Sequence, residues 1–306
     1  DIGRYSVAVC AILAVALIVY GFNAWYLGGS EPLLGRFSIA TVQVSSRDTV
    51  GFGKEERGVF VFTALAQRLR EAGATAPDLL VYPFSPVEGA LYSGAKPSLN
   101  KNILVATRDS FLAWTKPLIP ASTTLMVWTT LYEDAKFYNV FEFMQKGALV
   151  SEYRKRDLFP FIDYTPRWAQ RIGFYTTQID MTAGDSSKIF VGGVKAGAML
   201  CSEIHKQDLA RSDAAGSFLL ISAGSEAIFV DDVASEYSLK AAQFRAAEND
   251  LPALRANVLG PSAIINRDGS ISARLDRGQG GVLRGFVDIR NPHHTLYNFM
   301  GNFCLQ

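Results

Sequence analysis

A cysteine and a carboxylate close one apolar segment of the chain. The stretch from Lys195 to Ile204, KAGAMLCSEI, is an apolar run that ends at Cys201, and Glu203 follows two residues later. A strand of small residues that delivers a cysteine to a turn exposes the sulfur at the rim of a sheet, where nucleophiles are found. A free cysteine after an apolar run is more commonly buried and only packs. Taken alone, the stretch leaves both interpretations open.

Other reactive side chains favour the nucleophile. Lys155 lies in a basic cluster with Arg154 and Arg156, between two hydrophobic segments, and Glu88 ends a proline-containing segment that follows an apolar strand. A cysteine, a lysine and a carboxylate together supply an activated nucleophile, a cation that stabilises an oxyanion, and a general base. The residue types therefore permit nucleophilic catalysis at Cys201.

Composition limits the kinds of function that are possible. The 306 residues are 49% hydrophobic and 19% charged, which suffices for one large core, or for one core and a membrane segment. The net charge of +1 and the lack of a long basic run exclude a nucleic-acid footprint. The cysteines at positions 10, 201 and 304 are odd in number and far apart, so we expect no disulfide framework, metal site or cofactor. Residue 1 is Asp, which indicates a fragment or a processed form.

An uncharged segment near the start predicts a transmembrane helix. Tyr5 to Leu27 comprises 23 residues without a charge, or roughly 34 Å of helix at about 1.5 Å per residue, enough to cross a bilayer. A secretory signal peptide is the alternative, but its apolar core is usually shorter and no clean cleavage site is evident. We expect residues 1–30 to form a transmembrane helix and linker, and the remainder to lie outside the cytoplasm.

The elements that must position the reactive residues form an α/β pattern over residues 31–306. Apolar residues at three- and four-residue steps predict a helix at 58–73, and the continuous apolar run at 78–83 predicts a strand buried on both faces. Further strands are expected at 37–44, 122–130 and 218–224, a strand pair at 189–200, a hairpin at 138–153 with its turn at 145–147, and helices at 205–216 and 237–249.

Three segments carry a family resemblance. YRKRDLFPFIDYTP (Tyr153 to Pro166), AMLCSEI (Ala198 to Ile204) and FRAAENDLPALRAN (Phe244 to Asn257) resemble, in order and spacing, the carbon–nitrogen hydrolase (nitrilase) superfamily. More narrowly, they are similar to the catalytic domain of the apolipoprotein N-acyltransferases. The resemblance covers Phe37 to about Asn302 and implies a four-layer α-β-β-α sandwich of the nitrilase type, preceded here by one transmembrane helix.

The resemblance implies roles for particular residues. Cys201 matches the nucleophile and Lys155 the lysine that holds the developing oxyanion. Two supporting carboxylates are expected: Asp163 stands where the acyltransferases have a second essential glutamate, and Glu203 completes the Cys-x-Glu pattern.

The chain departs from the family pattern where the general base is expected. The family has a glutamate directly after the proline that follows the strand at 78–83, and this chain has Phe84, which cannot accept a proton. The nearest carboxylate is Glu88, which acts as the base if the loop is rearranged and is a solvated loop residue if it is not. Ser225 to Phe229 and Ser238 also replace side chains that the family has near its site.

The resemblance implies an acyltransferase. Its expected reaction moves an acyl chain from a phospholipid to the N-terminal amine of an apolipoprotein, through a cysteine thioester, at the periplasmic or extracellular side of a bacterial inner membrane. An amidase acting on a small substrate and a catalytically impaired homologue remain alternatives. The apolar segment before residue 28 favours lipid substrates, whereas Phe84 favours the impaired homologue. An apolar loop that contains Phe161 and Trp168 faces either lipid or the protein interior.

Overall fold

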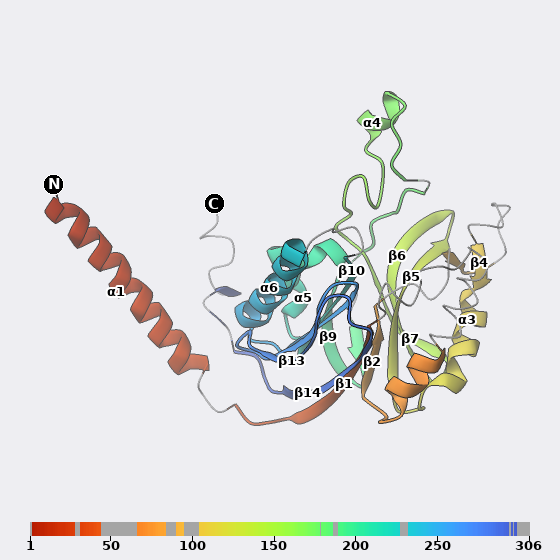
Figure 1. Ribbon diagram of the computed structural model, residues 1–306, viewed down its shortest axis with the longest axis horizontal. Helices are drawn as coiled ribbons and strands as arrows, with labels where there is room; N and C mark the ends of the chain where they lie inside the picture. Colours follow the sequence, from red (N-terminus) through yellow and green to blue (C-terminus); the bar gives the residue numbers. More distant parts are fainter. Residues whose placement is uncertain are drawn as a thin grey trace.

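The fold consists of two facing β-sheets with helices on their outer sides (Figure 1). The computed structural model describes residues 2–27, 31–43, 66–83, 90–94, 104–177, 179–185, 189–226, 232–293, 295 and 297–298. One apolar cluster lies between the two sheets, and a further cluster lies between each sheet and its helices. The four-layer α-β-β-α sandwich that the sequence predicts is therefore confirmed.

The first sheet has the strand order β14-β1-β2-β5-β3-β4, with β6 beside β5 and β7 beside β6. Its strands are β1 (Gly35–Gln43), β2 (Leu79–Tyr82), β3 (Ala90–Tyr92), β4 (Leu104–Thr107), β5 (Thr124–Glu133), β6 (Lys136–Gln145), β7 (Ala148–Arg154) and β14 (Gly281–Ile289). All four residues of β2 are buried, as expected of a parallel strand covered on both faces.

The hairpin between β6 and β7 turns where the sequence predicts. Lys146 and Gly147 both have positive φ, 56° and 76°. Two successive positive φ angles define the tight turn whose twist matches that of a β-hairpin. The turn fixes the antiparallel register that brings Arg154 opposite Val140. The loop that carries Lys155 thus begins directly at the end of a rigid hairpin.

The second sheet has the order β13-β12-β11-β10-β9-β8. Its strands are β8 (Ile189–Val191), β9 (Val194–Leu200), β10 (Leu219–Ser225), β11 (Ala253–Val258), β12 (Ser262–Ile265) and β13 (Ile271–Leu275). The neighbours β9, β10 and β11 run parallel. Their carboxyl ends therefore meet at one edge, where ligand sites of parallel sheets form.

Helices cover the outer side of each sheet (Figure 1). The helical residues 66–73 and α3 (Arg108–Thr115), which continues into η2 (Lys116–Leu118), cover the first sheet; α5 (Gln207–Ala214) and α6 (Asp232–Asn249) cover the second. The helix predicted at 205–216 is split, because Lys206 is extended between the 3-10 helix η3 (Cys201–His205) and α5. α6 begins five residues earlier than predicted, and the short α4 (Arg167–Arg171) lies on a projecting loop.

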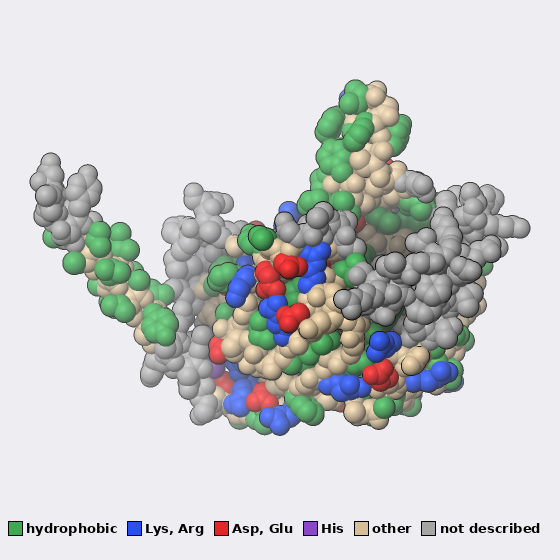
Figure 2. Space-filling model, in the orientation of Figure 1, with side chains coloured by type: hydrophobic (Ala, Val, Ile, Leu, Met, Phe, Trp, Pro, Cys, Tyr) green, Lys and Arg blue, Asp and Glu red, His purple; other side chains and the backbone are tan. Residues whose placement is uncertain are grey.

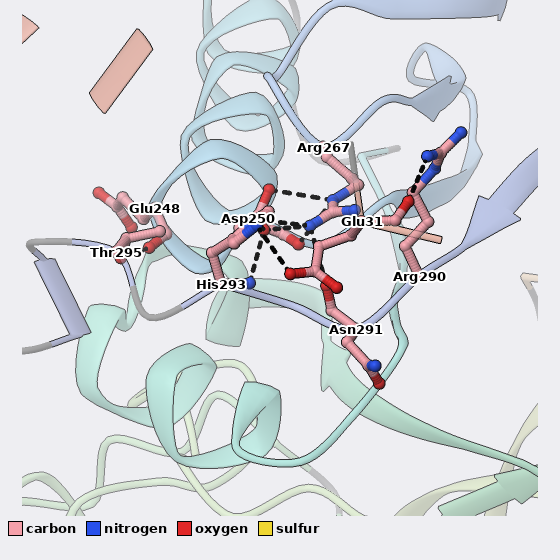
Figure 3. Close-up of polar contacts among 8 residues, drawn as sticks. All are labelled: Glu31, Glu248, Asp250, Arg267, Arg290, Asn291, His293 and Thr295. Carbon is pink, nitrogen blue, oxygen red and sulfur yellow. Dashed lines mark hydrogen bonds and ion pairs between the residues drawn. The ribbon is translucent and has the colours of Figure 1, made fainter. Parts of the chain in front are cut away.

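A polar cluster joins the two ends of the sandwich domain (Figure 3). Asp250 directly follows α6 with φ of 52°, and its buried carboxylate pairs with Arg267. The same carboxylate accepts a hydrogen bond from the backbone N–H of His293 (2.7 Å), and its Oδ2 lies 2.9 Å from the His293 ring Nδ1. His293 Nε2 lies 3.4 Å from Glu31 Oε1, while Arg290 donates to the Glu31 carbonyl. These contacts fix the segment after α1 against the last strand.

The helix α1 (Ile2–Leu27) stands apart from the sandwich (Figure 1). Its described apolar side chains are largely exposed; for example, Val7 and Ile18 are both 70% exposed. Within the described ranges, no helix is found with the length and hydropathy needed to cross a membrane. The predicted helix is confirmed, but its transmembrane character is not, and the division into residues 1–30 and 31–306 stays a prediction.

Candidate active site

Cys201 occupies a strained position at the end of β9. The strand ends at Leu200, η3 begins at Cys201, and Cys201 has a φ of 56°. A left-handed backbone costs a non-glycine residue on the order of 1–3 kcal/mol, and such strain is found at sharp strand-to-helix turns that present a nucleophile. Gly224 of β10 makes room for this turn, because a Cβ at Gly224 would lie 3.0 Å from Cys201 Cα. The structure therefore places Cys201 at the strand exit that the sequence predicts.

Glu203 holds this turn in place. Its side chain is fully buried, and Oε2 accepts hydrogen bonds from Leu200 N and Tyr153 Oη, both at 2.7 Å. Oε1 accepts from the backbone N–H groups of Arg156 (2.7 Å) and Asp157 (3.0 Å). Burial and the charge of Glu203 raise the pKa of Tyr153, so its hydroxyl remains a donor. With four donors, Glu203 links the turn to the loop after β7 and has little capacity left to accept a proton.

Lys155 and Asp163 form a buried ion pair on one wall of the site. Their side chains are 2% and 4% exposed, and Lys155 Nζ lies 2.5 Å from Asp163 Oδ2. Asp163 also accepts hydrogen bonds from Asn139 Nδ2 (2.8 Å) and the Phe159 backbone N–H (2.7 Å). A buried ion pair is stable only when further hydrogen bonds satisfy it, and this pair has them. Asn139 was not predicted from the sequence, although an amide between Tyr138 and Val140 in β6 was a usable signal.

Arg255 and Glu226 form a second buried ion pair on the opposite wall. Their side chains are 2% and 4% exposed; Arg255 Nη2 lies 2.5 Å from Glu226 Oε1, and Nη1 donates to Ser222 Oγ (2.9 Å). Among the residues that the structure describes, Glu226 Oε2 and Arg255 Nε have no hydrogen-bond partner. A Cβ at Gly260 would lie 2.0 Å from Glu226 Oε2, so a larger residue there would displace this carboxylate. The sequence analysis assigned no role to this pair.

A cavity of about 350 Å³ lies between these walls. Cys201 reaches it from one side, and both ion pairs and His205 contribute to its lining. Its apolar lining comes from Trp128, Phe159, Ile162 and Leu200. The cavity thus combines a thiol, a buried cation at Lys155, and an apolar space that can hold a hydrocarbon chain.

The structure brings together only part of the predicted site. Cys201, Lys155 and Asp163 share the cavity, whereas Glu203 lies behind the turn and does not line it. Phe84 and the predicted base Glu88 lie outside the described residues, so the role of Glu88 stays a prediction. In the described part of the chain, no three acidic, histidine or cysteine side chains are grouped as metal ligands.

The loop that follows Lys155 forms an arm that projects from the sandwich (Figure 1) and carries apolar side chains at its surface (Figure 2). Trp168 is 61% and Ile172 is 74% exposed, and the ring of Phe161 contacts the edge of Trp168, with centroids 5.9 Å apart. Two residues at the base of the arm, Phe159 and Ile162, line the cavity. Apolar side chains are therefore exposed on the arm, and two at its base line the cavity that contains the thiol.

Comparisons with known proteins agree with this geometry. The carbon-nitrogen hydrolase family profile matches residues 118–291, which is more than half of the chain. The apolipoprotein N-acyltransferase of Aquifex aeolicus is 26% identical over 72% of this chain and 47% of its own length. The enzyme of the same name from Sinorhizobium fredii is 24% identical over 99% of this chain and 59% of its own length. The chain spans about half the length of these curated relatives.

Solved structures show the same fold. An amidase from Nesterenkonia sp. superposes with a TM-score of 0.60 at 16% identity, covering 86% of this chain and 94% of its own. A carbon-nitrogen hydrolase from Helicobacter pylori G27 superposes with a TM-score of 0.60 at 17% identity, covering 83% and 89% of the two chains. A mutant of the Nesterenkonia amidase was solved with the acetamide moiety of fluoroacetamide added covalently at its active-site cysteine.

Proposed function

The chain belongs to the carbon-nitrogen hydrolase family, and from this premise we propose that it is an acyltransferase that carries an acyl chain as a thioester on Cys201. One observation supports the proposal above all. The strained turn presents the Cys201 thiol to an apolar cavity whose wall contains the buried ammonium group of Lys155. Apolar space beside a nucleophile and a cation suits a long acyl chain with a reactive carbonyl at its end.

In the first step, the Cys201 sulfur attacks the carbonyl carbon of an acyl ester. Negative charge develops on the carbonyl oxygen, and Lys155 is the buried cation on the cavity wall that can stabilise it. Asp163 and its further donors hold the ammonium group in position before the substrate arrives, so little reorganisation is needed during the reaction. The C–O bond then breaks, the alcohol leaves with a proton, and the thioester remains.

In the second step, a primary amine attacks the thioester carbonyl. The same cation stabilises the oxyanion, the C–S bond breaks, and the thiol regains a proton while the amide product leaves. Cys201 must return to the same geometry after each cycle. The four hydrogen bonds to Glu203 keep the turn fixed between the two steps.

The proposed acyl donor is a phospholipid, and the proposed place of reaction is a membrane surface. The exposed apolar arm and the exposed side chains of α1 support contact with lipid. Apolar residues at the base of the arm, Phe159 and Ile162, continue into the cavity and offer an acyl chain a path to the thiol. The proposed acceptor, the N-terminal amine of an apolipoprotein, follows the name of the relatives. The corresponding location is the periplasmic or extracellular side of the bacterial inner membrane.

The test is a labelling experiment. The protein is incubated in vesicles with a phospholipid that carries a labelled acyl chain, and a hydroxylamine-sensitive adduct is sought on the protein. The adduct should be lost in Cys201→Ala and kept in Cys10→Ala, because Cys10 lies on the exposed surface of α1. An adduct that survives in Cys201→Ala contradicts the proposal.

The acceptor distinguishes the alternatives. Transfer of the label to a peptide whose N-terminal cysteine carries a diacylglyceryl group supports the acyltransferase. Release of ammonia from small amides without peptide labelling indicates an amidase. A reactive Cys201 thiol that never forms an acyl adduct indicates the impaired homologue.

A further inference from the structure

The thiol proton of Cys201 needs an acceptor within reach of the cavity. Besides the thiol, five titratable or charged groups line the described walls: Lys155, Asp163, His205, Glu226 and Arg255. Lys155 and Arg255 are cations in buried ion pairs and serve only as donors. The Asp163 carboxylate already accepts from three donors. These three groups are therefore excluded as the acceptor.

Glu226 is held by Arg255. Its Oε1 is occupied by the guanidinium, and its unpartnered Oε2 lies beside the position that a Cβ at Gly260 would take. Proton transfer to this carboxylate would leave Arg255 buried without a counter-charge, which is costly. The remaining group on the described walls is His205.

His205 lies on the same short helix as Cys201. The two residues begin and end η3, and both line the cavity. Because both side chains line the same cavity, a proton can pass between them directly or through one water molecule.

The imidazole ring is held by α6. It stacks on the ring of Tyr237 with centroids 5.4 Å apart and planes 12° from parallel. Its Nε2 lies 3.4 Å from Ser238 Oγ. Two neighbouring residues of one helix thus fix both the plane of the ring and the direction of one nitrogen.

The hydrogen bonds of Ser238 favour one tautomer. The Ser238 hydroxyl lies 3.2 Å from the Ala234 carbonyl, to which it can donate its single proton. In that arrangement its oxygen accepts from His205, Nε2 carries the proton, and Nδ1 carries a lone pair. Over the described ranges, no hydrogen bond engages His205 Nδ1.

Burial, and then the surrounding charges, keep this ring neutral. Desolvation lowers the pKa of His205, and the positive charges of Arg255 on β11 and Arg245 on α6 lower it further. The negative charge of Glu226, which directly follows β10, raises the pKa of His205, but by less than either desolvation or Arg255 lowers it. A neutral imidazole at pH 7 is able to accept a proton.

We propose that His205 is the general base of this site, taking the Cys201 proton on Nδ1 directly or through one water molecule. The proton transfer creates a thiolate and an imidazolium. As the thiolate attacks the acyl ester and the C–O bond breaks, the imidazolium returns the proton to the leaving alcohol. In the second step, which rests on the proposed acyltransferase function, Nδ1 takes a proton from the attacking amine and returns it to the departing sulfur.

The experiment measures alkylation of the 306-residue chain by iodoacetamide between pH 5.5 and 9, with peptide mass spectrometry to quantify Cys201. Exposed Cys10 provides an internal reference in the same sample. His205→Gln is the informative variant, because the glutamine amide can still donate to Ser238 but has no basic nitrogen. His205→Asn repeats the test with a side chain of different length, and the thermal midpoint of each variant checks folding.

His205→Gln should lower the Cys201 alkylation rate at pH 7 on the order of tenfold and leave the Cys10 rate unchanged. The rate in the variant should keep rising above about pH 8, where an unassisted thiol ionises, whereas the wild-type rate should already be level at pH 7, because the lowered pKa of His205 keeps the base neutral there. Ser238→Ala should give an intermediate decrease, because the base remains but its orientation is lost. Lys206→Gln, which changes the neighbouring charge that pairs with Asp157, should have little effect.

An unchanged Cys201 rate and pH profile in folded His205→Gln overturns the proposal. The proposal is also overturned if Glu88→Gln lowers the Cys201 alkylation rate and His205→Gln does not, because Glu88 is then the general base. Alkylation requires neither acyl donor nor acceptor, so it tests His205 separately from the proposed function. If Cys201 alkylation depends on His205 but no acyl adduct ever forms on Cys201, only the proposed acyltransferase function is contradicted. If His205→Gln transfers acyl chains at an unchanged rate, only the assignment of His205 as the general base is contradicted.

Discussion

The two walls of the thiol cavity each carry a buried ion pair, and the two pairs are satisfied to different degrees. Asp163 on one wall accepts from Lys155, Asn139 and a backbone N–H. On the other wall, Glu226 accepts from Arg255 alone and keeps one oxygen without a partner among the described residues.

The difference follows from the elements that supply the residues. Asp163 lies in a loop, where backbone N–H groups such as that of Phe159 are free to bind a side chain. Glu226 directly follows β10, and Arg255 lies inside β11, so their neighbours' backbone groups are largely used by the sheet. An unsatisfied buried group costs on the order of 1–3 kcal/mol. The Lys155–Asp163 pair is therefore suited to hold a cation in place. The Arg255–Glu226 pair is suited to fix the edge of the sheet.

The largest expected effect is that of Lys155→Met. Loss of the oxyanion donor should reduce acyl transfer on the order of 10²-fold or more. It also leaves Asp163 buried without its cation, which should cost about 3–5 kcal/mol in the free energy of unfolding. Turnover assays and urea unfolding measure the two effects separately.

Two further variants test the assignment of Lys155. Adding Asp163→Asn to Lys155→Met should recover stability but not activity, because the orphaned charge is removed while the cation is still missing. Arg154→Ala should barely change turnover, since its guanidinium pairs with Glu133 and Glu152 away from the cavity. Equal losses in Lys155→Met and Arg154→Ala would mean that the cluster acts only through general charge.

The second prediction concerns the ion pair between Glu226 and Arg255. Glu226→Ala should lower the free energy of unfolding by about 3–5 kcal/mol, because Arg255 is left buried without a counter-charge. Combining it with Arg255→Met should recover much of that loss. We expect the folded double variant, Glu226→Ala with Arg255→Met, to keep most of its acyl-transfer rate, because Lys155 supplies the oxyanion donor. A loss as large as that of Lys155→Met would show that both walls take part in catalysis.

The third prediction tests the fit of the turn at Cys201. Gly224→Ala should cost about 1–3 kcal/mol and reduce turnover, because the added Cβ would lie 3.0 Å from Cys201 Cα and the turn must shift. Gly35→Ala is the matched control, since nothing lies within 4 Å of a Cβ added there. Similar unfolding curves for the two variants would indicate that the turn has room to move.

The last prediction is a pH dependence of stability from a third ion pair, Arg156 and Asp213, whose side chains are 13% and 11% exposed. Burial, which outweighs the attraction of Arg156, raises the pKa of Asp213 from 3.8 to about 6. The folded state therefore binds this proton more tightly than the unfolded state. The stability from this group is complete below about pH 4 and is lost as the pH rises to about 6.

Urea unfolding at several pH values between 4 and 7 measures this dependence. The slope from Asp213 should not exceed about 1.4 kcal/mol per pH unit. Asp213→Asn should flatten the curve in this window. An unchanged slope in Asp213→Asn would assign the dependence to another carboxylate.

The sequence by itself determined the local features of the fold and predicted three of the side chains that line the cavity, Cys201, Lys155 and Asp163. The unbroken apolar run of β2 specified a strand buried on both sides, and the turn at Lys146 and Gly147 specified a hairpin. Small residues followed by Cys201 specified a strand that ends in a sharp turn. These features depend on neighbours in the chain, which a sequence displays directly. Lys155 was predicted to lie at the site because the contiguous segment around it, Tyr153 to Pro166, resembles a family motif.

The tertiary structure alone decided which polar groups share the cavity and how many hydrogen bonds each of them can still form. Arg255 meets Glu226 across 29 positions, and Asn139 meets Asp163 across 24. The tautomer of His205 depends on Ser238, which lies 33 positions away. Strand order and helix placement bring these groups together, and burial then determines whether each has a partner. Because hydrogen-bond capacity and desolvation are properties of a three-dimensional neighbourhood, no local pattern in the chain encodes them.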